Sequence, residues 1–421
     1  MFDMLVNSWK VKQIRKQLYY ILAILAIYRI GCHIGLPGIS PEAVTGQMAG
    51  MQQGLFAIIT GGGQGTVFAM GIGPYITSSI IMQLLTVAIP KLEALNKEGE
   101  EGRKKINQYT RYAAVALAIM QAIGTVYSLR TAFVHQNMFV YVAAVAVLVT
   151  GAMFIVWIAE FLTEKGLPNG SSFIIFSNIL SSLPRSVTAL YGAAISAGPW
   201  AFAVVLGVLI VFLGIIAFVI RVQDGERKIP VQYSKKMVGR QMVGGQSSYL
   251  PIKVNIAGVM SIIFAISLLQ FPQTIYSFWQ NATLEKMINW LEVSHPFGAG
   301  LYVVLIFCFT FFYTSFSINP IEMAENLKKN AGFIPGIRPG KPTSDYIQRT
   351  VTRLSWIGAV YYSIIAMAPV VLEWILLWVF GQKISIGFGG TTLLIVTGVA
   401  LDLVKQFESQ LLMRHHKGIL S

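Results

Sequence analysis

The stretch that decides the fold reads Gly71-Ile-Gly-Pro-Tyr-Ile-Thr-Ser-Ser-Ile-Ile-Met-Gln-Leu-Leu85. It is apolar enough to lie in a membrane, yet it begins with a Gly-x-Gly-Pro breaker, and glycine and proline both disfavour a helix interior. Residues spaced at i, i+4, i+7 and i+11 share one helical face. Here that face changes from apolar to polar through Ile72, Ile76, Ser79 and Gln83. The pattern is typical of a broken helix that lines a path inside a membrane protein.

A second apolar run, Leu55-Phe-Ala-Ile-Ile-Thr60, lies just upstream and is closed by Gly61-Gly-Gly63. It is too short to cross a bilayer, because a span needs about 20 apolar residues. Lysine and arginine are absent between Arg29 and Lys91, which places the run on the outer side of the membrane. We therefore expect it to be re-entrant or packed against protein.

The composition sets the class of protein. Apolar residues make up 55% of the chain and charged residues 12%, whereas soluble domains carry about 25% charged residues. We predict an all-α polytopic membrane protein. The net charge of +14 needs no nucleic acid to explain it, because basic residues accumulate on the cytoplasmic side of membrane proteins. The two cysteines are expected to be unpaired, and the histidine spacing predicts no metal site.

The apolar pattern predicts ten spans near 18–36, 71–89, 111–129, 139–162, 172–191, 200–220, 254–271, 300–319, 354–379 and 384–404. Residues 1–17 are expected to form an interfacial helix, and 405–421 a tail. With this count, 27 lysines and arginines fall on one side of the membrane and four on the other. The asymmetry places both termini in the cytoplasm.

Ten spans divide into halves of five, 18–195 and 196–404. Span two is interrupted at Gly73-Pro74, and span seven is irregular in the corresponding place around Asn255 and Gly258. Matching irregular helices in two halves are typical of an inverted repeat around a central path. The odd number of spans per half makes the second half enter the membrane from the opposite side.

Two expected cytoplasmic loops, 221–253 and 321–353, are long and basic. The simplest interpretation is a topology signal with anionic-lipid contact, worth about 1 kcal/mol per basic residue near the surface. The alternative is a pair of structured loops that present Arg240 and Arg338 to a large partner, either an RNA backbone or an acidic protein surface.

Few ionisable residues lie at membrane depth, where an enzyme or ion-coupled transporter needs them. Arg29, Glu160, Glu373 and Asp402 show no obvious pairing, so catalysis is not expected. Isoleucines at i, i+4 are usually core packing, but Ile72 with Ile76 and Ile175 with Ile179 would also suit a constriction that excludes water and ions. A small-solute transporter with inverted repeats stays open as the alternative function.

Seven stretches carry a family resemblance: Phe68–Ile76, Glu101–Tyr112, Gly225–Tyr233, Leu250–Val259, Asn319-Pro320, Gly332–Gly340 and Gly389–Ile395. In number, order and loop placement they resemble the SecY/Sec61-alpha family of protein-translocation channels. The resemblance implies two pseudo-symmetric inverted halves of five helices, a re-entrant plug at 55–64, and a sideways opening between spans two and seven. Unfolded secretory polypeptides would cross it, and transmembrane segments would leave it laterally.

The resemblance also assigns sites to residues of this chain. The pore ring would comprise Ile72, Ile76, Ile175, Ile179, Ile263 and Ile395. The plug would comprise Leu55, Phe56, Ile58, Ile59, Thr60, Gly61 and Gly62. The lateral gate would comprise Thr77, Ser79, Gln83 and Asn255. Docking of a motor or ribosome would use Arg227, Lys228, Lys235, Lys236, Arg240, Arg338 and Lys341.

The partners that the resemblance implies are the small membrane subunits SecE and SecG, the SecA ATPase, the ribosome with its rRNA, signal sequences, nascent polypeptides and anionic lipids. The expected location is the bacterial plasma membrane. The pore would be passive and would hold neither a cofactor nor a metal.

Overall fold

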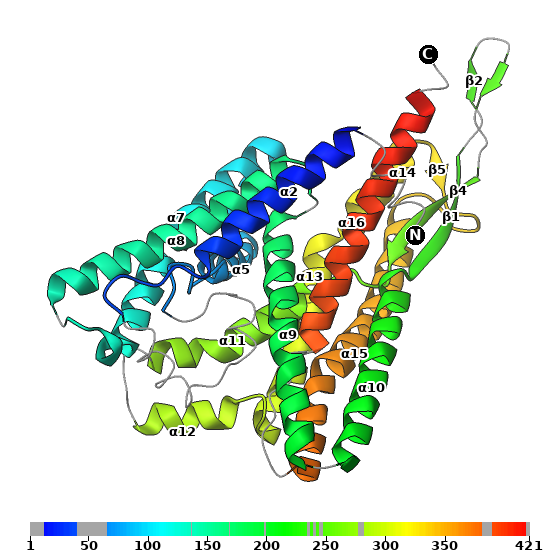
Figure 1. Cartoon of the computed structure of the whole chain (residues 1–421). Coiled ribbons are helices and arrows are strands. Elements are labelled where there is room, and N and C mark those ends of the chain that lie inside the picture. Colours follow the sequence, from blue (N-terminus) through cyan, green and yellow to red (C-terminus); the bar gives the residue numbers. More distant parts are fainter. Residues whose placement is uncertain are drawn as a thin grey trace.

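The computed structural model describes residues 12–39, 65–135, 137–167, 169–197, 199–233, 236–238, 241–243, 247–276, 282–380 and 390–417. Helices dominate it (Figure 1). The first half of the chain supplies α2 (Lys12–Gly31), α5 (Gly73–Ala88), α6 (Pro90–Lys97), α7 (Glu100–Ser128), the 3-10 turn η1 (Arg130–Ala132), α8 (Met138–Glu164) and α9 (Gly170–Ala197). The second half supplies α10 (Pro199–Gln223), α11 (Met260–Tyr276), α12 (Ala282–Leu291), α13 (Pro296–Ser317), α14 (Pro320–Lys329), α15 (Lys341–Phe380) and α16 (Gly390–Lys417).

Each of the ten expected spans overlaps one of these helices, although several boundaries differ. α2 begins at Lys12 and continues into span one. Residues 12–17 of the expected interfacial helix therefore belong to the same helix as that span. α7 and α15 begin 11 and 13 residues before the expected spans. α11 begins only at Met260, so 254–259 is not helical, and α12 was not predicted.

By length and composition, four of the described helical segments can cross a membrane: Met138–Glu164, Val205–Gln223, Pro296–Lys329 and Lys341–Trp378. α5 and α6 add a fifth if they are taken as one span, bent by 100° at Ile89. The bend follows from Pro90, because proline keeps the preceding residue out of the helical region. The count of ten spans therefore stays a prediction.

Helix packing follows the same order in the two predicted halves. In the first half α5 packs on α7, α7 on α8 and α8 on α9, and in the second α11 packs on α13, α13 on α15 and α15 on α16. The halves meet where α9 packs on α10 and α16 (Figure 1). In the described part of the chain, α5 and α11 are not among the helix pairs with extensive contact.

Strands form in the two long loops, where none was predicted. β1 (Glu226–Tyr233) pairs antiparallel with β4 (Ser247–Lys253), and β5 (Gly332–Phe333) adds to the other edge of β1. β2 (Lys236–Val238) and β3 (Gln241–Val243) pair with each other in the segment between β1 and β4. The three-stranded sheet lies at one end of the molecule and α12 at the opposite end (Figure 1).

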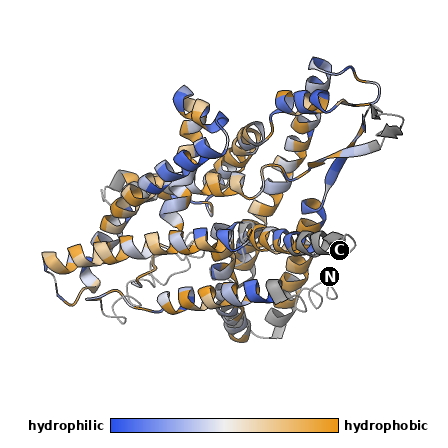
Figure 2. Cartoon of the chain, turned by 90° about the horizontal axis from the view of Figure 1, so that it is seen from above, coloured by the Kyte–Doolittle hydropathy of each residue, from blue (hydrophilic) through white to orange (hydrophobic). Residues whose placement is uncertain are grey.

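The buried side chains form separate clusters rather than one central core. One joins α2, α5, α8, α9 and α16, a second joins α10, α11, α13, α15 and α16, and a third joins α7 with α8. A fourth packs the sheet on α14 and the start of α15. Figure 2 shows hydrophobic residues along most of the helix lengths and hydrophilic ones toward several helix ends and on the β1–β4 hairpin.

Candidate functional site

Four of the expected ring isoleucines lie together where the halves meet. Ile72 precedes α5, Ile175 and Ile179 belong to α9, and Ile395 belongs to α16. All four are buried in one cluster, with exposed fractions of at most 4%. A cluster drawn from α9, α16 and the start of α5 at the junction of the halves is what a constriction requires, since no single helix can close a path.

The other two ring positions differ. Ile76 on α5 is half-buried and packs against the same cluster. Ile263 on α11 is half-buried, while its neighbours Ile262 and Ile266 belong to the second cluster. Among the described residues, the structure therefore brings five of the six expected ring isoleucines together and leaves Ile263 apart.

The local sequence explains how Ile72 reaches the cluster. Gly71 has a φ of 53°, a left-handed conformation that suits glycine. Pro74 then lies in the first turn of α5, where its fixed φ favours helix initiation. After this turn, Ile72 is 0% exposed and lies in the same cluster as Ile175 and Ile179 of α9.

The expected gate residues lie on α5 and just before α11. Thr77 donates a hydrogen bond to the carbonyl oxygen of Gly73 at 3.1 Å, and Ser79 is half-buried. Gln83 Oε1 and Asn255 Oδ1 are buried, and neither has a hydrogen-bond partner in the described part of the chain. Asn255 was expected inside span seven but precedes α11 by five residues. Both proposed sides of the gate therefore hold a buried acceptor.

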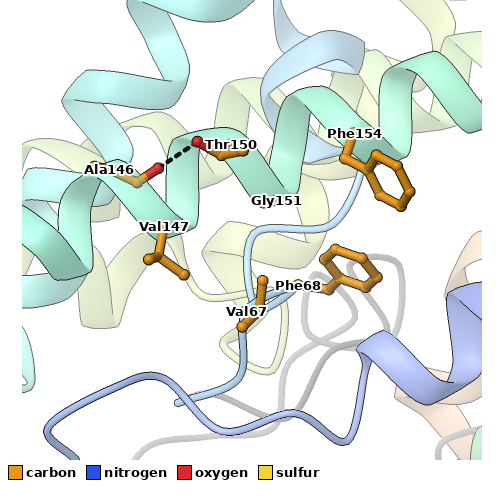
Figure 3. A pocket seen from close by; sticks show the side chains of 7 residues that line it. All are labelled: Val67, Phe68, Ala146, Val147, Thr150, Gly151 and Phe154. Carbon is orange, nitrogen blue, oxygen red and sulfur yellow. Dashed lines mark hydrogen bonds between the residues drawn. The ribbon is translucent and has the colours of Figure 1, made fainter.

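The plug residues, Leu55, Phe56, Ile58, Ile59, Thr60, Gly61 and Gly62, lie outside the described residues. The chain after them is fixed against the segment that follows α2, since Leu36 N donates to Gly65 O at 2.8 Å and Val67 N to Ile34 O at 3.0 Å. Beside it is an apolar hollow of about 360 Å³ between Val67, Phe68 and α8 (Figure 3). Its one hydroxyl, on Thr150, is satisfied by the Ala146 carbonyl oxygen at 2.7 Å.

Four of the expected docking residues lie on or near the three-stranded sheet. Arg227 and Lys228 are exposed on β1, Arg338 is exposed after β5, and Lys341 is exposed at the start of α15. Lys236 belongs to β2, and Lys235 and Arg240 lie outside the described residues. Pairing of Gln232 with Phe333 joins the two basic loops, which are about 100 residues apart in sequence, into one sheet. The described parts of both loops are structured, in line with the second of the two interpretations.

Two ion pairs connect segments that are far apart in sequence, and one of them involves Glu160, which shows no obvious partner in the sequence. Glu160 Oε1 on α8 forms an ion pair with Arg111 Nε on α7 at 2.7 Å. At the sheet end of α16, Lys405 Nζ lies 2.8 Å from Asp224 Oδ1. The hydrogen bond that Lys405 donates to Asp224 raises the pKa of the Lys405 ammonium. Both cysteines are free, as predicted.

A polar contact between α2 and α9 was not predicted. The Tyr28 hydroxyl donates to Asn178 Oδ1 at 2.8 Å, and Arg29 lies against Ser177 and Asn178. Arginine at membrane depth was the available signal, because such a charge needs a partner. Within the described ranges, no group of three or more His, Cys, Asp or Glu side chains is placed to hold a metal.

Known proteins are similar to this chain over nearly its whole length. A family model described as SecY matches residues 66–404. The protein translocase subunit SecY of Streptomyces galbus is 40% identical over 445 residues, with 100% of each chain covered. That of Aquifex aeolicus is 41% identical over 432 residues, with 99% of each covered. The chain belongs to the SecY family.

Solved structures share the SecY fold at low sequence identity. A protein conducting channel superposes with a TM-score of 0.65 at 17% identity, covering 93% of this chain and 91% of the other. Sec61 in the canine ribosome-channel complex from the endoplasmic reticulum gives a TM-score of 0.60 at 15% identity, with 93% and 91% covered. These similarities support the helical membrane-protein fold.

Proposed function

We propose that this chain is the central subunit of a protein-conducting channel. Unfolded secretory polypeptides cross through it, and transmembrane segments leave it sideways between α5 and α11. The observation that carries the proposal is the isoleucine cluster at the junction of the halves, with Ile72, Ile175, Ile179 and Ile395 buried together. Aliphatic side chains around a constriction exclude water and ions without binding a particular solute. That property suits a cargo of variable sequence.

Family membership supports a channel over the small-solute transporter and over an enzyme. The curated relatives are protein translocase subunits, and the fold is that of protein-conducting channels. The repeated order of helix packing supports two halves of five spans, although the boundary at 195/196 falls inside α9. The plug at 55–64 and the ring and gate positions belong to the same proposal.

The energy for transport comes from a bound partner, a SecA motor or a translating ribosome. Support comes from the basic sheet end of the molecule and from structural neighbours in ribosome complexes, canine Sec61 and yeast Ssh1. SecE and SecG complete the channel, and anionic lipids contact the remaining basic residues. The location proposed is the bacterial plasma membrane. The sheet end faces the cytoplasm with both termini, in line with the distribution of basic residues.

The proposal is tested by polar substitution in the cluster. In proteoliposomes that contain the complex purified through this chain, Ile179→Asn is expected to raise the ion conductance of the idle channel and to relax its selectivity for signal sequences. An amide in the constriction admits water where isoleucine excludes it. Leu180→Asn is the matched control, because Leu180 is the next residue of α9 and is 50% exposed. Equal conductance and selectivity in the two variants would remove Ile179 from the constriction.

A further inference from the structure

Two polar side chains of α2 meet α9 beside the isoleucine cluster. The Tyr28 hydroxyl donates to Asn178 Oδ1 at 2.8 Å, and Arg29 Nη2 lies 3.5 Å from the same oxygen. Arg29 also donates to the backbone carbonyl oxygen of Ser177 and lies 3.4 Å from its hydroxyl. Tyr28 is 0% exposed and Asn178 is 2% exposed. The contact between Tyr28 and Asn178 is therefore buried, and it joins residues 150 positions apart.

Asn178 lies between two ring isoleucines along α9. At 3.6 residues per turn, its side chain leaves the helix roughly 60° from Ile175 and roughly 100° from Ile179. The direction in which Asn178 points therefore determines where both isoleucines point. Because its oxygen is held by α2, Ile175 and Ile179 are turned toward Ile72 and Ile395.

Rotation of α9 about its axis would break this contact. A buried amide without a hydrogen bond is unfavourable, and so is an arginine at membrane depth that has lost its partners. Isoleucine packing by itself resists rotation less, since one aliphatic side chain can replace another in a non-directional cluster. The hydrogen bonds to Asn178 are directional, and the packing of the isoleucine ring is not.

We infer that Tyr28 and Arg29 are positioning residues for the constriction: through Asn178 they set the rotation of α9, and with it the seal of the idle channel and its selectivity for signal sequences. The inference rests on the proposed function, because it assumes that Ile175 and Ile179 line the path.

The first test removes only the hydroxyl. Tyr28→Phe is expected to raise the idle ion conductance of the complex in proteoliposomes about fivefold, the population factor that corresponds to one hydrogen bond of about 1 kcal/mol. Selectivity for signal sequences should relax in parallel. Tyr20→Phe is the matched control, because it makes the same change at an exposed tyrosine of the same helix. Ile179→Asn, measured alongside, reports whether the ring itself is correctly assigned.

The outcomes separate the two hypotheses. If Ile179→Asn raises the conductance and Tyr28→Phe matches Tyr20→Phe, the positioning role is wrong and the channel proposal stands. If Ile179→Asn has no effect, the ring assignment fails, and the inference fails with it.

A second pair of variants guards against a simple folding defect. Asn178→Asp keeps an oxygen acceptor and adds a charge opposite Arg29, so its conductance is expected to stay at or below that of the native chain. Asn178→Leu removes the acceptor and should raise the conductance as Tyr28→Phe does. The double variant with Tyr28→Phe should be no leakier than Asn178→Leu alone, because both changes remove the same contact. Additive effects, or a leaky Asn178→Asp, would overturn the inference.

Discussion

At the scale of single residues, close backbone approach makes one glycine of α9 irreplaceable and another dispensable. A Cβ built on Gly170 would lie 1.9 Å from the carbonyl oxygen of Ala159 on α8, while one on Gly192 would meet nothing within 4 Å. Gly170→Ala is therefore expected to destabilise the chain by roughly 1–3 kcal/mol through overpacking. Gly192→Ala should stabilise it by about 0.5–1 kcal/mol through helix propensity.

The measurement is the fraction of chain that stays monodisperse in detergent after heating, followed across a temperature series. The monodisperse fraction of Gly170→Ala should fall at a lower temperature than that of the native chain. For Gly192→Ala it should fall at the same or a higher temperature. A native-like transition temperature for Gly170→Ala would show that α8 and α9 can move apart at this position without loss of stability.

Residue patterns could predict the isoleucines of the site, but not the hydrogen bond between Tyr28 and Asn178 that lies beside them. Spacing within one helix pairs Ile72 with Ile76 and Ile175 with Ile179, and the family resemblance adds Ile395. The contact of Tyr28 with Asn178 spans 150 positions, and no local pattern marks two such residues as partners. Long-range hydrogen bonds depend on how helices rotate against each other, which periodicity alone leaves open.

At the scale of elements, helices were predictable and their ends less so. Every expected span overlaps a helix, because long apolar runs are a strong signal. α11 begins six residues later than expected, after Gly258 adopts a φ of 60°. The pairing of β1 with β5 was not foreseen, because β5 has only two residues and lies far from β1 in sequence.

The sheet that joins the two basic loops leads to a prediction about docking. Arg338→Glu reverses an exposed charge beside β5 and is expected to reduce motor- or ribosome-driven translocation at least about tenfold, since charge complementarity controls such encounters. Membrane insertion of the chain should be unaffected. Lys286→Glu is the control, because it reverses a charge on α12 at the opposite end of the molecule (Figure 1). Native-like translocation with Arg338→Glu would remove Arg338 from the docking surface.

At the scale of the whole molecule, contact between the halves is one-sided. α9 packs on α10 and α16, while α5 and α11 are not among the extensively packed pairs of the described chain. A molecule joined along one side can open along the other. The buried acceptors Gln83 Oε1 and Asn255 Oδ1 belong to α5 and to the segment just before α11. The isoleucine cluster includes side chains of α9, α16 and the start of α5. In the proposed channel, a shift of α5 away from α11 would therefore also disturb the constriction.

In the proposed channel, the two unpaired oxygens predict a closed gate that is less stable than one packed by apolar side chains alone. A buried oxygen without a donor is unfavourable by about 1–3 kcal/mol, and opening relieves it by admitting water or cargo. Gln83→Met and Asn255→Leu remove these oxygens at similar volume, so each should favour the closed gate and slow preprotein translocation at least about fivefold. Initial rates in proteoliposomes measure this, with Gln348→Met at an exposed site of α15 as control. Faster translocation by either gate variant would show that its oxygen stabilises the closed arrangement instead.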